Sequence, residues 1–121
     1  MSEVKNYDAE CLFCNIIQGG IPSTKVYEDD LCFAFRDIAP QAPVHVLVIP
    51  KEHIASAAEL NEDNISAAAH ILTVIPQIAA AEGLAESGYR IISNVGDDAG
   101  QSVHHLHFHI LGGRRLNDQM A

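Results

Sequence analysis

QSVHHLHFHIL, the stretch from residue 101 to residue 111, places histidines at positions 105, 107 and 109 with one apolar residue in each gap. Side chains of a β-strand point alternately to its two faces, so His105, His107 and His109 are expected to share one face. The intervening apolar side chains would then enter a hydrophobic core. The stretch therefore predicts a strand that presents a row of three imidazoles to one surface.

A turn rich in glycine and hydrogen-bond donors leads into this row and includes Gly96, Gly100, Gln101 and Ser102. Glycine lets backbone N–H groups approach an anion closely, and such turns bind phosphate oxygens. A neutral imidazole can attack phosphorus, so we predict His107, flanked by imidazoles on both sides, as a nucleophile. Ser102 could pass a proton to the leaving group. The competing interpretation, a row of surface or internally hydrogen-bonded histidines, is the weaker one for three histidines in register.

The composition describes a soluble globular protein and limits its partners. The 121 residues suffice for one domain with a hydrophobic core, and 48% of them are hydrophobic. The net charge of −9 argues against nucleic acid and acidic membranes as partners, so a phosphate ligand has to be small. No apolar run approaches the roughly 20 residues of a membrane span, and the N-terminus lacks a signal core. The three cysteines suit no disulfide framework, so the expected location is the cytoplasm.

Proline and glycine positions divide the chain into short elements. Their order predicts an α+β fold with an antiparallel sheet of about five strands, one long helix and one short helix. We expect a single domain over residues 1–121, with residues 1–8 as a loose lead and residues 115–121 as a C-terminal tail. The expected elements are a helix over 11–18, strands over 25–28, 31–36 and 44–49, a long helix capped by Asn61 and ended by Gly83, a strand over 89–94 and the histidine strand.

The two helices have apolar positions that should face the core. On the short helix these are Leu12, Ile16 and either Cys11 or Phe13. On the long helix an apolar repeat of helical period predicts the buried side as Ile65, Ala68, Ala69, Leu72, Ile75 and Ala79.

The pair Cys11 and Cys14 has the spacing of half a zinc site, and a tetrahedral site needs two further ligands. His53 and His105 are the natural candidates, and the metal would then be structural. Two alternatives stay open. The pair could be a redox dithiol, although no thioredoxin-like pattern surrounds it, or simply two buried cysteines.

Three further residues have both a functional and an ordinary interpretation. Asp37 follows a strand and could accept hydrogen bonds from a ribose diol, or it could be a solvated turn residue. Asn94 precedes the glycine-rich loop and could bind phosphate or cap a turn. His45, inside an apolar strand, is either a satisfied core histidine or a partner of a site residue.

The stretch QSVHHLHFHILGGR, residues 101–114, resembles the signature of the histidine triad (HIT) nucleotide-binding family. Its Gly-Gly-Arg ending is similar to the purine nucleoside phosphoramidase branch. The resemblance extends to nearly the whole chain through the blocks at residues 21–22, 26–30, 34–45 and 48–54.

The resemblance implies a catalytic cycle and a set of site residues. His107 would form a transient nucleotidyl-histidine, flanked by His105 and His109, with Ser102 assisting the leaving amine. The implied nucleotide-binding residues are Asp37, Ile38, Asn94, Gly100, Gln101, Ser102, Val103, His107 and His109. The zinc ligands of related proteins correspond to Cys11, Cys14, His53 and His105, and no organic cofactor is implied.

The resemblance also implies a homodimer whose two sheets join into one, with a nucleoside monophosphate site in each subunit. The implied reaction is hydrolysis of adenosine or guanosine 5′-phosphoramidates at the P–N bond, and of aminoacyl- or lysyl-adenylates. The alternatives are hydrolysis of dinucleoside polyphosphates, or a nucleotide-binding scaffold whose turnover is incidental. The chain departs from the family pattern at His104, where an aromatic residue is usual, at Arg36, where a histidine is frequent, and in a tail without tryptophan.

Overall fold

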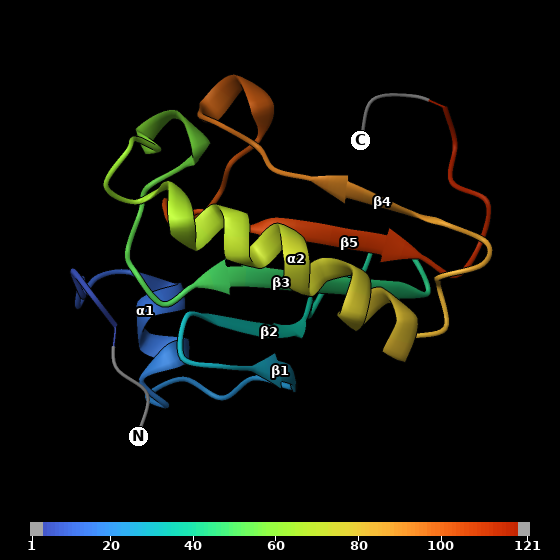
Figure 1. Cartoon of the computed structure of the whole chain (residues 1–121), viewed down its shortest axis with the longest axis horizontal. Coiled ribbons are helices and arrows are strands. Elements are labelled where there is room, and N and C mark those ends of the chain that lie inside the picture. Colours follow the sequence, from blue (N-terminus) through green and yellow to red (C-terminus); the bar gives the residue numbers. More distant parts are fainter. Residues whose placement is uncertain (1–3, 119–121) are drawn as a thin grey trace.

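Five antiparallel strands form one sheet in the computed structural model, which describes residues 4–118 (Figure 1). Their order across the sheet is β1-β2-β3-β5-β4, so β1 and β4 are the edge strands. The predicted α+β fold is confirmed, with one long and one short helix. The expectations for residues 1–3 and 119–121 fall outside the described residues. The strands are β1 (Lys25–Glu28), β2 (Cys32–Arg36), β3 (Val44–Pro50), β4 (Tyr89–Ile92) and β5 (Phe108–Gly112).

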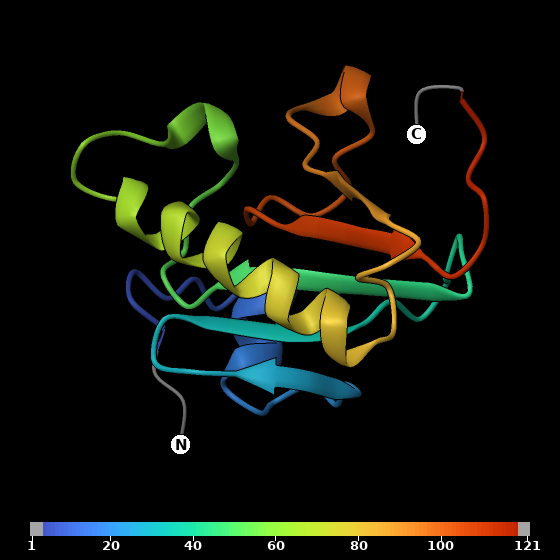
Figure 2. The same cartoon turned by 45° about the vertical axis from the view of Figure 1, so that its right-hand side comes forward.

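The two helices cover opposite faces of the sheet. Figure 2 shows α2 (Ile65–Ala81) crossing the front of the sheet, with α1 (Leu12–Ile17) behind the strands. The face under α2 buries Val46, Val48 and Ile110 together with the helix residues Ile71 and Ile75. The face under α1 buries Phe33, Phe35, Leu47 and Ile49 around Phe13. Alternation along β3 therefore supplies both cores, as expected for a strand buried on both sides. Among the described residues, no helix is both long and apolar enough to cross a membrane.

The predicted buried side of the long helix was only partly right. Ile65 and Leu72 are 49% and 51% exposed, and Ala69 is also exposed. The helix begins at Ile65 rather than directly after Asn61, whose side chain instead accepts hydrogen bonds within the preceding turn. The helix carries two apolar stripes one residue apart, and the bulkier stripe packs on the sheet. The buried positions are Ala67, Ala68, Ile71, Val74, Ile75, Ile78 and Ala79.

The short helix differs from its prediction in one inward residue. Cys11 caps the helix, and its sulfur accepts a hydrogen bond from the Cys14 N–H at 3.3 Å. Leu12 is 44% exposed, whereas Phe13 and Ile16 are buried. The buried side of the helix is formed by Phe13, Ile16 and Ile17, and Leu12 lies outside it.

The prediction of one continuous histidine strand was wrong. The strand β5 begins only at Phe108, so among the triad only His109 lies on it. Its last pairing with β3 joins Phe108 to Val48. Before that point the chain turns away, and the Leu106 N–H binds the carbonyl of Ile54. His105 and His107 therefore lie in an irregular segment that leads into the strand.

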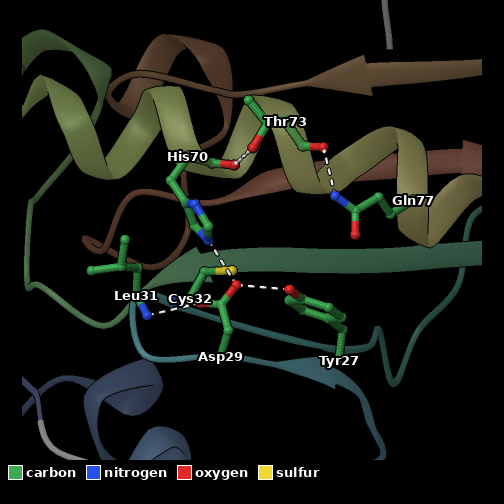
Figure 3. A network of polar contacts seen from close by, with 7 residues as sticks. All are labelled: Tyr27, Asp29, Leu31, Cys32, His70, Thr73 and Gln77. Carbon is green, nitrogen blue, oxygen red and sulfur yellow. Dashed lines mark hydrogen bonds and ion pairs between the residues drawn. The ribbon is translucent and has the colours of Figure 1, made fainter.

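A half-buried carboxylate, that of Asp29, ties α2 to the turn between β1 and β2 (Figure 3). One oxygen of Asp29 lies 2.7 Å from His70 Nε2 and accepts from the Tyr27 hydroxyl at 2.8 Å. The other accepts from the N–H groups of Leu31 and Cys32 at 2.8 and 2.9 Å. Burial opposes ionisation, but these hydrogen bonds outweigh it and hold the pKa of Asp29 well below its usual range.

Candidate active site and metal centre

His107 lies immediately before β5, with 6% of its surface exposed. Its Nδ1 is 2.7 Å from the main-chain carbonyl oxygen of His105. A carbonyl can only accept, so His107 Nδ1 carries the proton and Nε2 keeps its lone pair. The edge of the Phe13 ring packs against the imidazole at a centroid distance of 5.1 Å, which restricts its rotation. His107 is therefore held in a fixed orientation, with Nε2 as the nitrogen left for a substrate.

His109 lies beside His107, with a centroid distance of 5.1 Å between the rings, and its tautomer follows from a chain of contacts. The backbone N–H of Gln41 donates to His45 Nδ1 at 3.1 Å, so the proton of His45 is on Nε2. That Nε2 is 2.8 Å from His109 Nδ1 and 3.5 Å from an oxygen of Asp37. The remaining proton of His109 is consequently on its Nε2, where it can donate to a substrate.

Burial keeps the imidazoles of His109 and His45 uncharged. The pKa of His109 is lowered to about 4 by burial, with further contributions from His107 and His45. Burial also lowers the pKa of His45, and the charge of Asp37 opposes this only in part. At neutral pH the pair is therefore neutral, with its protons held as the hydrogen bonds require.

The glycine-rich loop is shaped by Gln101, which is buried. Its amide oxygen accepts from Gly96 N–H at 2.9 Å, and its amide nitrogen donates to the carbonyls of Ala55 and Val103 at 2.8 and 3.0 Å. Gly100 adopts φ +81°, a left-handed conformation that favours glycine. Gln101 thus uses its side chain to hold the loop, while Ser102 is exposed and Val103 half-buried.

A cavity of about 390 Å³ opens beside His109. It brings together His45, His109 and Asn94 with residues of β4 and of the segment after β5. Of the other nucleotide-binding candidates, Asp37 reaches this region through His45, whereas Ile38 is fully exposed. The lining residues are Gln41, His45, Arg90, Ile92, Asn94, His109, Leu111, Arg114, Leu116 and Asn117.

The four predicted metal ligands form one cluster. Cys11 Sγ lies 3.3 Å from His105 Nδ1, and Cys14 Sγ lies 3.2 Å from His53 Nδ1. The two Nδ1 atoms are 3.2 Å apart, and all four donor atoms lie within 4.8 Å of one another. The set of two sulfurs and two nitrogens matches the tetrahedral ligand sets of structural zinc sites. The cluster can therefore hold a metal ion, and its donors suit zinc.

The orientation of His105 fits a metal-binding role. Its Nε2 is 2.9 Å from the carbonyl oxygen of Pro50, so Nε2 carries the proton and Nδ1 directs a lone pair at the cluster. The pKa of His105 is lowered to about 4, mainly by burial, which keeps the ring neutral. Burial raises the pKa of Cys14 to about 12, a shift that a nearby cation would oppose.

Sequence reasoning missed the roles of two residues. The sequence left two interpretations of His45 open, a core residue or a partner of a site residue. The structure places His45 against His109. Phe13 was considered only as a core residue, yet it packs against both His105 and His107. The apolar residues around His45 on β3 gave one signal, because an imidazole buried among them requires a polar partner. No local pattern marks Phe13.

Comparisons with known proteins agree with this geometry. The profile of the HIT domain matches residues 18–116. The chain is 46% identical to the purine nucleoside phosphoramidase of Escherichia coli K12 over 93% of this chain and 94% of that protein. A HIT family hydrolase from Legionella pneumophila has a TM-score of 0.88 at 51% identity, covering 90% of this chain and 97% of its own. A histidine triad protein from Clostridium difficile has a TM-score of 0.90 at 46% identity, with 93% and 98% covered.

Proposed function

The chain belongs to the HIT family and is a hydrolase homologous to purine nucleoside phosphoramidases, and from that premise we propose its reaction. The substrates are adenosine or guanosine 5′-phosphoramidates, cleaved at the P–N bond, together with aminoacyl- and lysyl-adenylates. The observation that carries the proposal is the hydrogen bond from His107 Nδ1 to the carbonyl of His105, which leaves Nε2 free to attack phosphorus.

The reaction proceeds in two displacements at phosphorus. In the first, His107 Nε2 forms a bond to phosphorus, the P–N bond breaks, and the leaving amine takes a proton from the Ser102 hydroxyl. In the second, water attacks the nucleotidyl-imidazolium, releasing the nucleoside monophosphate and restoring neutral His107. The second displacement returns a proton to Ser102. Splitting the reaction in this way replaces one difficult step by two easier ones.

His109 supplies charge stabilisation rather than a bond. Its Nε2–H donates to a non-bridging phosphoryl oxygen, on which negative charge grows during the displacement. The donor is preorganised because His45 holds the opposite nitrogen of the ring at 2.8 Å. We therefore assign His45 as a positioning residue and His107, His109 and Ser102 as catalytic residues.

Two groups of residues hold the nucleotide, one at the ribose and one at the phosphate. Asp37 and Ile38 contact the ribose, while Asn94 and the backbone N–H groups of the loop at Gly100, Ser102 and Val103 bind the phosphate. Gln101 keeps that loop in shape, because its amide is already committed to internal hydrogen bonds. A glycine-containing loop with this conformation suits a phosphate better than a bulky group.

Zinc, when bound, supplies a fixed cross-link rather than a reacting group. Cys11, Cys14, His53 and His105 would hold it. Since the His105 carbonyl orients His107, a metal on the His105 ring stabilises the main chain that positions the nucleophile.

We also propose a homodimer in which the β4 edges of two copies pair. The outer edge of β4 has no neighbouring strand among the described residues, and Ile91 on this strand is 44% exposed. An open strand edge with an exposed apolar residue favours pairing with a second copy.

Turnover of matched substrates tests the proposal. An adenosine phosphoramidate should be hydrolysed far faster than a diadenosine polyphosphate, and His107→Ala should abolish the phosphoramidate activity. Faster hydrolysis of the diadenosine substrate would favour a dinucleoside polyphosphate hydrolase. A scaffold role would instead be supported if His107→Ala retained nucleotide binding and left the cellular phenotype unchanged.

A further inference from the structure

A second group of potential metal ligands lies between α2 and the β1–β2 turn, on the opposite face of the sheet from Cys11 and Cys14. It consists of Asp29 in the turn, Cys32 at the start of β2 and His70 on α2, and we call it the Asp29 cluster. A carboxylate oxygen, a sulfur and an imidazole nitrogen of these residues lie within 4.8 Å of one another. Figure 3 shows the three side chains converging. None of them has a role in the reaction proposed above.

The main chain orients the carboxylate of Asp29 toward the other two side chains. Its Oδ1 accepts hydrogen bonds from the N–H groups of Leu31 and Cys32, so its Oδ2 is directed at His70, 2.7 Å away. The Tyr27 hydroxyl donates to the same Oδ2 at 2.8 Å. Carboxylates that bind metals are commonly oriented by hydrogen bonds of this kind. Asp29 is therefore already positioned as a ligand.

Asp29 carries a negative charge without a permanent cation beside it. Within residues 4–118 no lysine or arginine lies within 4.0 Å of this carboxylate, and its ion-pair partner is His70. Lys51, whose charge also acts on this region, pairs with Glu28 at 2.7 Å. Burial opposes ionisation of Asp29, but its hydrogen bonds hold the pKa well below the usual range. A half-buried anion of this kind favours the binding of a cation.

The thiol of Cys32 supplies a metal donor rather than a nucleophile. The side chain is fully buried, and burial, followed by the charge of Asp29, raises its pKa to about 12. A reactive cysteine needs an accessible thiolate, which this position does not provide. A bound cation, by contrast, stabilises the thiolate directly. The arrangement of Cys32, His70 and Asp29 thus suits metal binding and not covalent catalysis.

We propose that the Asp29 cluster binds a second divalent cation of the zinc type through Asp29 Oδ2, Cys32 Sγ and His70 Nε2. Zinc accepts oxygen, sulfur and nitrogen ligands, and three protein ligands leave its fourth position for water. Asp29 and His70 are only half-buried, so an ion can enter from their side. Binding releases the thiol proton of Cys32 to solvent and leaves the ring proton of His70 on Nδ1.

The second ion should bind more weakly than the ion held by Cys11 and Cys14. Two ligand atoms of one tetrahedral zinc lie about 3.3 Å apart, for bonds of about 2.0–2.1 Å. His70 Nε2 and Asp29 Oδ2 are 2.7 Å apart, so the His70 ring has to move away by about 0.6 Å. This site also has one protein ligand fewer. We therefore expect it to fill only when zinc is added to the purified protein.

Equilibrium dialysis of the whole chain against excess zinc, followed by metal analysis, tests the proposal. The wild-type protein should rise from about one to about two ions per chain, whereas Cys32→Ala and His70→Gln should each remain at about one. Asp30→Asn and His104→Gln remove an exposed acid and an exposed histidine, and these controls should still take up the second ion. Cys14→Ser separates the two sites, because it should lose the first ion and keep the second.

Cobalt(II) identifies the sulfur that binds the second ion. Added to the zinc-loaded wild-type protein, it should produce a sulfur-to-cobalt charge-transfer band that is absent from zinc-loaded Cys32→Ala. Circular dichroism shows whether each variant is folded, and His70→Gln alone decides the matter if Cys32→Ala does not fold. No second ion in the wild-type protein would mean that the cluster is a hydrogen-bond network only. A second ion retained by either variant, or lost from either control, would likewise overturn the proposal.

Discussion

At the scale of single residues, hydrogen bonds to main-chain groups determine which nitrogen of each imidazole carries its proton. The carbonyl of His105 fixes the proton of His107 on Nδ1, and the N–H of Gln41 fixes that of His45 on Nε2. Because His45 Nε2 donates to His109 Nδ1, the proton of His109 is in turn placed on its Nε2. Main-chain groups therefore leave the lone pair of His107 on Nε2 and, through His45, place the proton of His109 on its Nε2.

The partly buried, neutral state of His109 makes stability depend on pH. Its folded pKa of about 4 lies below the unfolded value near 6.5, so the unfolded chain binds more protons as the pH falls between them. Its contribution to stability is complete above pH 6.5 and is lost as the pH falls toward 4. From pH 7 to pH 5, His109 alone should reduce the free energy of unfolding by about 2 kcal/mol. Urea unfolding at both pH values checks this.

The control for that measurement is His109→Asn, which removes the titrating group. The difference in unfolding free energy between pH 7 and pH 5 should shrink by a similar amount in the variant. An identical difference in both proteins would mean that His109 does not titrate as proposed.

At the scale of elements, the Asp29 contacts connect α2 to the β1–β2 turn (Figure 3). Leu31 in that turn accepts a hydrogen bond from Lys51, and Cys32 pairs with Pro50. The carbonyl of Pro50 in turn orients His105. The network thus supports the strand end that carries part of the metal centre.

Asp29→Asn should destabilise the protein by roughly 2–3 kcal/mol, because an amide cannot serve all the donors that converge on this carboxylate. Asp30→Asn, at the adjacent exposed position, is the matched control and should change stability by less than about 0.5 kcal/mol. Chemical denaturation at pH 7 measures both. Equal effects of the two substitutions would show that the network contributes little.

The elements also show what the sequence could predict. Turn residues and prolines bounded the first four strands to within two residues of their observed ends, whereas the histidine strand begins only at Phe108, later than expected. The buried side of α2 could not be chosen, since Leu72 and Ile71 belong to competing apolar stripes and only the sheet surface selects between them. The histidine alternation was misread as one strand because His105 is drawn toward Cys11 and Cys14, a tertiary effect. By contrast, the ligand cluster followed from spacing and resemblance.

At the scale of the whole molecule, one face of the sheet forms the main core and the other carries the candidate site. One face is covered by α2 and forms the larger apolar core. On the other face α1 covers β2 and β3, while the part of β5 that carries His109 adjoins the open cavity. The predicted metal ligands lie where α1 meets the segment before β5, so a bound metal would join parts of the chain that are about 90 residues apart in sequence.

Purified protein should contain about one zinc ion per chain, because the four donors converge without rearrangement. Removing the metal with a chelator should lower the melting temperature by about 5 °C or more, since a ligand that binds only the folded state stabilises it. Cys14→Ser should lose the metal, whereas Cys32→Ser, outside the cluster, should retain it. Metal-free protein with an unchanged melting temperature would refute a structural zinc site.

The central claim is that His107 Nε2 forms a covalent bond to the substrate's phosphorus. Intact-mass spectrometry after rapid mixing with a slowly hydrolysed adenosine phosphoramidate tests it most directly. We predict a species heavier by one adenylyl group, mapped to the peptide containing His107 and absent from His107→Ala. Turnover without any such adduct, or an adduct on another residue, would contradict the account.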